Sequence, residues 1–360
     1  MNIALFYGGK SSEHDISIIT ESIVREFFQK EHTIYNIYID KTGIFYLATS
    51  ATPQEHLTAK FRKSLIRVTL LPSDNTLYSV VGGRLHKVAK LDASINCTHG
   101  VNGEDGSLAG LLQLSNVKEV ESGICASSVC MDKAVSKVFF KGLGLPVVEG
   151  VVYNYYESKE ELISKVENLG FPLIVKPCNC GSSIGVAFVK DTLQLMEKID
   201  VALNFDNKLI IEKGLTNFIE VNCSALKINN EAHCSDLEKP MSSSEILSFA
   251  DKYIASGKTK KRSFPYHCKY EEEIKVATKR IYQSLGCNGV IRVDFMVTPD
   301  GYFVNEANTI PGSFAYGLWS NRYTRSEYGN ILLDCAFSAS HLVTYDFNSN
   351  VLIGEPICKK

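Results

Sequence analysis

The sequence predicts an α/β protein whose first part is an open, parallel sheet covered by helices. Residues 3–7 form an apolar strand that reaches a Gly-Gly turn, and Ile16, Ile19, Ile23 and Phe27 then recur at the spacing of an amphipathic helix. Alternation of strand and helix is typical of sheets whose ligands bind beyond the carboxyl ends of the strands. Further strands are predicted at 33–39 and 94–98.

Composition excludes several classes of protein. The 360 residues are 45% hydrophobic and 22% charged, which is enough apolar material for two or three domains of ~150 residues each. A net charge of −2 gives no attraction to nucleic acid or anionic lipid, so small molecules are the expected partners. The N-terminus resembles no export signal, no apolar run approaches the ~20 residues of a membrane helix, and eleven cysteines favour a reducing compartment. A cytoplasmic location is predicted.

A helix at 131–141 opens the second part of the chain and is expected to end at Gly142 in a left-handed conformation. Strands at 173–176 and 186–189 flank a Gly-Ser loop in the manner of an antiparallel pair. The polar stretch 235–266 is expected to be a flap. The inward face of the helix is predicted to hold Ala134, Val135, Val138 and Phe139.

The sharpest constellation lies on a predicted hairpin near the C-terminus. Arg292 and Asp294 share one face of the first strand, and Glu306 and Asn308 share one face of the second. A three-residue loop with Gly301 at positive φ would set Asp294 opposite Glu306 and Arg292 opposite Asn308. Four polar groups would then converge on one face of the hairpin.

Two carboxylates and an amide oxygen are hard ligands suited to magnesium that bridges nucleotide phosphates. The alternative is a solvated sheet face with cross-strand ion pairs, which an isolated hairpin would favour. The segment after Asn308 favours the magnesium site, because it leads into a tight turn at Pro311-Gly312 whose backbone N–H groups can bind an oxyanion.

Lys176 ends a strand before the loop that contains Gly181, Ser182 and Gly185, and the amides of such a loop can cover a phosphate. A plain hairpin turn is an equally good interpretation of the loop alone. The segment 8–11 is not a Walker A loop, since that motif needs glycine at the position of Ala4.

Other polar groups give weaker signals. Glu13 at a helix start either complements the helix dipole or holds a substrate ammonium group. His99 with Glu104-Asp105 is interpreted as a polar loop network, and Trp319 as part of a core cluster. Cys178 and Cys180 are too close together for a zinc knuckle.

Taken in order, seven motifs resemble the D-alanine–D-alanine ligases of the ATP-grasp superfamily, and they span nearly the whole chain. The resemblance therefore implies an ATP-grasp fold after the N-terminal α/β domain. The motifs are the segments 8–17, 99–106, 131–133, 175–186, 251–253, 292–294 and 305–312.

That resemblance also implies a role for each candidate residue. Lys133, Lys176, Ser183 and Lys252 would bind ATP phosphates, Glu212 the adenine and Glu220 the ribose. Asp294, Glu306 and Asn308 would hold two Mg²⁺ ions, which Mn²⁺ would be able to replace. Glu13 would bind the ammonium group of the first D-alanine, Ser182 and Tyr253 would link it to the closing flap, and Arg292 with the Gly312 amide would form the oxyanion site.

The implied reaction phosphorylates the carboxylate of one D-alanine and lets the amino group of a second displace the phosphate, for peptidoglycan precursor synthesis. The implied domains are an N-terminal substrate domain at 1–115, a central ATP-grasp subdomain at 116–205 and a catalytic domain at 206–360. A homodimer is a further family expectation.

Gly317 departs from the family pattern, because a serine that meets the second substrate's carboxylate is usual at this position. D-serine, glycine or another small amino acid is therefore an alternative acceptor. Lys252-Tyr253 argues against a hydroxy acid acceptor. A regulator that binds ATP or an amino acid without catalysis is the alternative from a different class.

Overall fold

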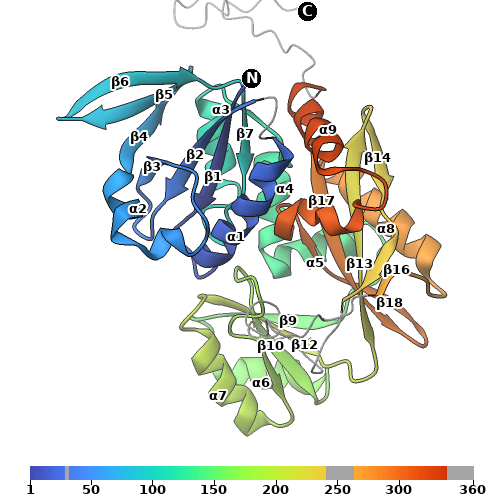
Figure 1. Cartoon of the computed structure of the whole chain (residues 1–360). Helices are drawn as coiled ribbons and strands as arrows, with labels where there is room; N and C mark the ends of the chain where they lie inside the picture. The colour runs from blue at the N-terminus through green and yellow to red at the C-terminus, as the bar shows by residue number, and fades with distance from the viewer. Residues whose placement is uncertain (29–31, 241–262, 339–360) are drawn as a thin grey trace, which may run out of the picture.

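The computed structural model describes residues 1–28, 32–240 and 263–338. These residues form three β-sheets with helices packed on them (Figure 1). None of their helices is both long and apolar enough to cross a lipid bilayer. The predicted residues Lys252 and Tyr253, together with most of the expected flap at 235–266, lie outside the described residues.

The N-terminal sheet has eight strands in the order β6-β5-β4-β3-β2-β1-β7-β8. β2, β1 and β7 are parallel neighbours, as predicted. β8 adds a further parallel strand, and β3 to β6 extend the sheet with antiparallel pairs, none of which the sequence analysis had predicted. The elements are β1 (Asn2–Gly8), α1 (His14–Val24), η1 (Arg25–Phe27), β2 (Thr33–Ile39), β3 (Phe45–Ala48), η2 (Glu55–Leu57), α2 (Ala59–Ser64), β4 (Ile66–Leu71), β5 (Asp74–Val81), β6 (Arg84–Lys90), β7 (Ala93–Asn96), α3 (Ser107–Leu114) and β8 (Lys118–Glu119).

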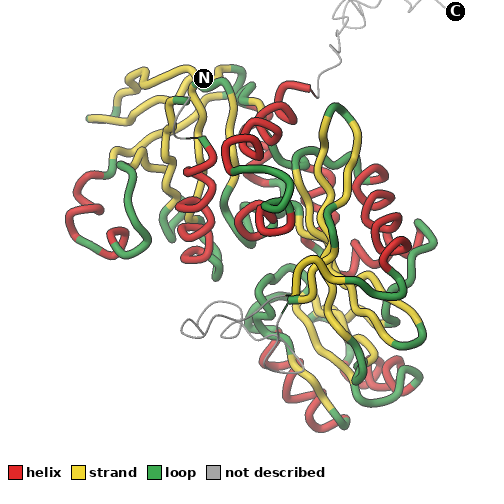
Figure 2. The backbone as a smooth tube through the Cα atoms, turned by 45° about the vertical axis from the view of Figure 1, so that its right-hand side comes forward, coloured by secondary structure: helices red, strands yellow, loops and turns green. Residues whose placement is uncertain are grey.

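A four-stranded antiparallel sheet follows in the order β11-β10-β12-β9, with α6 and α7 on one face (Figures 1 and 2). β12 belongs to this sheet although it lies beyond residue 205, so we propose that the central subdomain extends to Lys213. The elements are α4 (Gly123–Met131), α5 (Lys133–Gly142), β9 (Gly150–Asn154), α6 (Lys159–Glu167), β10 (Leu173–Pro177), β11 (Ala187–Val189), α7 (Thr192–Ala202) and β12 (Lys208–Lys213).

The third sheet has the order β16-β15-β13-β17-β18, and β14 pairs with β13. α5 and α4 pack against β18, while α8 packs against β13 and β14. The elements are β13 (Ile219–Ile228), β14 (Glu231–Cys234), β15 (Leu237–Lys239), β16 (Ser263–Tyr266), α8 (Glu271–Ser284), β17 (Val290–Thr298), β18 (Gly301–Asn308), η4 (Gly312–Leu318) and α9 (Arg325–Ser338).

One hydrophobic core joins the N-terminal sheet to the third sheet. It contains Tyr7 of β1, Leu226 of β13 and Trp319, which is fully buried and donates its indole N–H to Ser224 Oγ at 3.0 Å. The core interpretation of Trp319 is therefore confirmed. Replacing a buried tryptophan by alanine typically costs about 3–5 kcal/mol of stability. Packing around Trp319 therefore contributes to holding the first and third sheets together.

The predicted inward face of α5 is wrong for two of its residues. Val135 is 43% exposed and Val138 is 73% exposed, while Lys137 is buried. The helix also continues through Gly142, and the left-handed glycine that follows it is Gly144, at φ +71°. A face that carries a buried lysine cannot be found from apolar spacing.

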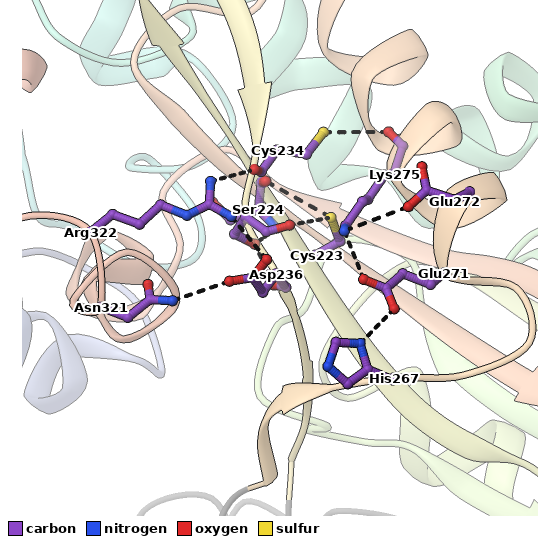
Figure 3. Close-up of polar contacts among 11 residues, drawn as sticks. Cys223, Ser224, Cys234, Asp236, His267, Glu271, Glu272, Lys275, Asn321 and Arg322 are labelled. Carbon is purple, nitrogen blue, oxygen red and sulfur yellow. Dashed lines mark hydrogen bonds and ion pairs between the residues drawn. The ribbon is translucent and has the colours of Figure 1, made fainter.

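A polar cluster fastens the chain after η4 to the end of the third sheet (Figure 3). Arg322 donates to Asp236 Oδ1 at 2.9 Å and to the Cys234 carbonyl oxygen at 3.0 Å, and Asn321 donates to Asp236 Oδ2 at 3.1 Å. These bonds fix the segment that follows the tight turn at Gly312.

Candidate active site

A cavity of about 470 Å³ lies where the three sheets meet. Its walls come from the start of α1, the loops after β7 and β10, the junction of α4 and α5, and the strands β13, β17 and β18. The predicted site residues that line it are Glu13, Lys133, Ser182, Glu220, Arg292, Asp294, Glu306, Asn308 and Gly312.

The β17–β18 hairpin has the predicted register at the site, but for a different reason. Asp294 is opposite Glu306 and Arg292 is opposite Asn308. The loop, however, leaves only residues 299–300 unpaired, and Gly301 is not at positive φ. A bulge at Asn305 inserts one residue into β18 and restores the alignment, as bulges beside active sites commonly do.

Each carboxylate of the hairpin has a cationic neighbour. Arg292 donates from Nε to Asp294 Oδ1 at 2.6 Å and from Nη2 to Asp294 Oδ2 at 2.8 Å, which is a bidentate pair. Asn308 Nδ2 donates to the same Oδ2 at 3.2 Å. Lys133 Nζ lies 3.7 Å from Glu306 Oε2. Opposed carboxylates repel, so these neighbours offset a real electrostatic cost.

The donor types at this face fit a magnesium ion. Asp294, Glu306 and Asn308 offer two carboxylates and an amide oxygen, the hard ligands that Mg²⁺ takes together with water and substrate phosphates. Within the described residues no group of three or more His, Cys, Asp or Glu side chains is arranged around a metal position. A carboxylate-rich protein cage is therefore not available in that part of the chain, and substrate oxygens would have to complete the shell.

Lys176 lies behind this face and contacts both the second and the third sheet. Its Nζ donates to Glu212 Oε2 at 2.6 Å and to Asn305 Oδ1 at 3.2 Å. Burial raises the pKa of Glu212, but Lys176 and Lys137 outweigh it and hold that pKa below its ordinary value. Glu212 is 1% exposed, so neither its carboxylate nor Lys176 lines the cavity.

Glu13 and Ser182 come together from distant parts of the chain. Ser182 Oγ donates to Glu13 Oε1, and Glu13 Oε2 is buried without a hydrogen-bond partner in the structure. A Cβ on Gly181 would lie 2.4 Å from that Oε2, so only glycine allows this approach. Burial and the nearby Glu104 raise the pKa of Glu13, against the lowering effect of the Ser182 hydrogen bond. Glu13 is thus more than a helix-dipole partner.

Three residues of the site were missed or undervalued by sequence reasoning. His99 and Glu104 line the cavity next to Glu13, with His99 Nδ1 3.6 Å from Glu104 Oε1. Burial lowers the pKa of His99, but Glu104 outweighs it, so that the pKa lies above its ordinary value. The signal for His99 and Glu104 in the sequence was their position after β7, at the end of a strand where ligands bind. No such signal pointed to Asn305, because only the bulge in β18 turns its side chain toward Lys176.

The remaining predicted residues lie at the margin. Ser183 follows Ser182 in the left-handed region, at φ +59°, and does not line the cavity. After Gly312, three non-glycine residues, 313–315, are also left-handed, a strained conformation found at functional turns. Gly317 is half-buried at the end of this turn and is not part of the cavity wall.

Comparison with known proteins finds matches to one family over most of the chain. The family models "D-ala D-ala ligase N-terminus" and "D-ala D-ala ligase C-terminus" match residues 2–122 and 139–326. A D-alanine–D-alanine ligase of Thermosipho africanus is 33% identical over 360 residues, covering 94% of each sequence.

Solved structures give the same result. The VanG D-Ala:D-Ser ligase from Enterococcus faecalis has a TM-score of 0.79 at 29% identity and covers 93% of this chain and 99% of its own. The D-alanine-D-alanine ligase from Coxiella burnetii has a TM-score of 0.78 at 25% identity and covers 94% of each chain.

Proposed function

Because this chain belongs to the D-alanine–D-alanine ligase family, we propose that it joins two D-alanine molecules while ATP is converted to ADP and phosphate. The product is a building block of peptidoglycan precursors. The observation that carries the proposal is the cavity of about 470 Å³ that is lined by both Glu13 and the polar groups of the β17–β18 hairpin.

The first D-alanine binds with its ammonium group at Glu13. Support comes from the buried Glu13 Oε2, an unpaired acceptor that a substrate cation would satisfy. The substrate carboxylate then points toward Arg292. Ser182 keeps Glu13 in place, because its hydroxyl bonds the other carboxylate oxygen.

A carboxylate oxygen of this D-alanine attacks the γ-phosphorus of ATP, the bond to the bridging oxygen breaks, and ADP leaves. Lys133 and Lys176 balance charge on the phosphate oxygens. Glu220, which lines the cavity, binds the ribose, and Ser183 and Lys252 belong to the phosphate side. The adenine contact of Glu212 stays a prediction, because that carboxylate is buried between Lys137 and Lys176. Magnesium held by Asp294, Glu306 and Asn308 would supply charge neutralisation of the phosphates.

The amino group of the second D-alanine attacks the carbonyl carbon of the D-alanyl phosphate and loses a proton, and phosphate leaves with the C–O bond electrons. Arg292 and the Gly312 N–H stabilise the intermediate oxyanion. Tyr253 and the segment 235–266 exclude water, which would otherwise hydrolyse the acyl phosphate.

One observation favours a second candidate for the acceptor. Gly317 replaces the family's usual serine, and a solved D-Ala:D-Ser ligase is among the structures that resemble this chain. The same chemistry would then join D-alanine to D-serine.

An acceptor panel tests the proposal. The purified protein is incubated with ATP, Mg²⁺ and D-alanine, alone or with D-serine, glycine or D-lactate, and products are measured by mass spectrometry together with ADP. D-alanyl-D-alanine from D-alanine alone is expected. A mixed dipeptide only in the presence of D-serine would replace the first candidate by the second. ATP binding without amino-acid-stimulated ADP release would identify a regulator.

We further propose that the enzyme acts in the cytoplasm as a homodimer, that Mn²⁺ can replace Mg²⁺, and that the first sheet forms the substrate domain while the other two form the ATP-grasp unit.

A further inference from the structure

Glu212 is a buried carboxylate shared between two lysines. Lys176 Nζ lies 2.6 Å from Glu212 Oε2, and Lys137 Nζ lies 2.7 Å from Glu212 Oε1. The side chains of Glu212 and Lys137 are only 1% and 8% exposed. One carboxylate thus neutralises two cations that come from different elements, Lys176 from β10 and Lys137 from α5.

The surrounding backbone is shaped for this arrangement. Glu212 is the register partner of Gly150, where a Cβ would lie 3.1 Å from Glu212 Cγ. On α5, Lys133 is one turn before Lys137 and faces the same side of the helix. Lys133 Nζ donates to the Cys180 carbonyl oxygen at 2.7 Å and lies near Glu306. One face of α5 therefore carries both Lys137, which neutralises Glu212, and Lys133, which lies near Glu306 of the proposed metal site.

The two lysines bonded to Glu212 are not equivalent. Lys176 also reaches Asn305 at the bulge beside the cavity, whereas Lys137 forms its ion pair with Glu212. If Lys176 turns to a nucleotide phosphate, Glu212 loses one of its two cations. A buried carboxylate without any cation is strongly unfavourable, so the remaining lysine decides whether that exchange is possible.

We propose that Lys137 is a positioning residue of the nucleotide site, which keeps Glu212 neutralised so that Lys176 can exchange its bond with Glu212 for a bond with an ATP phosphate. This inference rests on the proposed function, because it requires ATP as a substrate. Lys137 itself does not touch the nucleotide.

The titration behaviour is consistent with this role. Burial lowers the pKa of Lys137, and Glu212 opposes that effect. The pKa of Glu212 lies below its ordinary value because the two lysines outweigh burial, so Glu212 is ionised at neutral pH and needs a permanent counter-ion.

The test measures nucleotide affinity directly, by calorimetry with Mg²⁺ and a non-hydrolysable ATP analogue. Lys137→Met keeps the length of the side chain and removes the charge. It is expected to raise the Kd for the analogue about tenfold, because Lys176 then remains bound to Glu212. The KM for D-alanine should stay unchanged. Lys141→Met, an exposed position on the same helix, is the matched control and should bind as the unmodified protein does.

A double-mutant cycle with Glu212→Gln separates positioning from a general loss of structure. In the Glu212→Gln background, Lys137→Met should have little further effect, since no carboxylate is left to neutralise. The inference is overturned if Lys137→Met binds the analogue normally, or if its effect is as large without Glu212 as with it. Failure of the unmodified protein to bind any nucleotide would instead overturn the proposed function.

Discussion

At the scale of the residue, Glu13 shows how one carboxylate is tuned by its neighbours. Burial and Glu104 raise its pKa, while the hydrogen bond from Ser182 lowers it. A substrate ammonium group requires the ionised form. Ser182 therefore contributes to the reaction through Glu13, because its hydrogen bond lowers the pKa of that carboxylate and so favours the charged form.

Ser182→Ala should raise the KM for D-alanine at neutral pH about tenfold, the scale of one lost hydrogen bond to a charged group. Since the pKa of Glu13 would rise further, the acid limb of kcat/KM for D-alanine should move to higher pH. Ser164→Ala, at an exposed position on α6, is the control. An acid limb that stays in place would show that Ser182 does not act through Glu13.

Glu306→Gln should raise the Mg²⁺ concentration needed for half-maximal activity about tenfold or more, because a charged oxygen ligand becomes a neutral one. ADP release at increasing Mg²⁺ measures this, and EDTA should abolish it in the unmodified protein. Glu231→Gln, an exposed glutamate on β14, is the control. An unchanged Mg²⁺ dependence in Glu306→Gln would remove Glu306 from the metal site.

Sequence reasoning found the residues whose chemistry is conspicuous in an alternating strand. Asp294 and Glu306 were found because two carboxylates on one predicted face of a hairpin are suited to binding a divalent cation. Asn305 and Lys137 were not found. The first depends on a bulge, and the second lies on a helix where a lysine ordinarily faces solvent.

At the scale of the element, α5 illustrates the same limit. Its apolar residues predicted an inward face with Val135 and Val138, but both are exposed and Lys137 is buried. Periodicity assumes that the buried face is the apolar one. That assumption fails where a helix lines a charged site and its buried lysine meets Glu212. The β17–β18 register, in contrast, was predicted correctly at the site, although a bulge at Asn305 and not a three-residue loop produces it.

Helix α1 carries a buried acid, Glu21, whose carboxylate lies 3.4 Å from Arg25 Nη1. Burial raises the pKa of Glu21 to about 7, and Arg25 offsets this only in part. The unfolded chain ionises Glu21 near pH 4.3, whereas the folded chain keeps it protonated until about pH 7. The contribution of Glu21 to stability is therefore complete below the unfolded pKa and is lost as pH rises through the folded one.

Glu21→Gln should remove that loss. The fall in the free energy of unfolding between pH 5 and pH 8 should become smaller by about 2–3 kcal/mol, measured by urea denaturation at each pH. Glu167→Gln, on the exposed side of α6, should leave the fall unchanged. A variant whose pH dependence matches that of the unmodified protein would contradict the buried-acid account of Glu21.

At the scale of the whole molecule, the site exists only because three sheets meet. Glu13 comes after β1 of the first sheet, and Lys176 and Ser182 come from β10 and the loop after it in the second sheet. The acids of the β17–β18 hairpin come from the third sheet. The order of the motifs predicted this class of fold, but not the antiparallel extension of the first sheet, nor that the core around Trp319 joins the first sheet to the third. The core joins residues far apart in the sequence, such as Tyr7 and Leu226, which local patterns do not encode. The extension is built from short-range antiparallel pairs, which the sequence analysis missed.

The central claim is that this cavity brings the carboxylate of D-alanine to the γ-phosphate of ATP. The direct measurement uses D-alanine labelled with oxygen-18 in its carboxyl group and analyses the released phosphate by mass spectrometry. The account predicts labelled phosphate, because the attacking carboxylate oxygen leaves with the phosphoryl group when the peptide bond forms. Dipeptide formation with entirely unlabelled phosphate would contradict it.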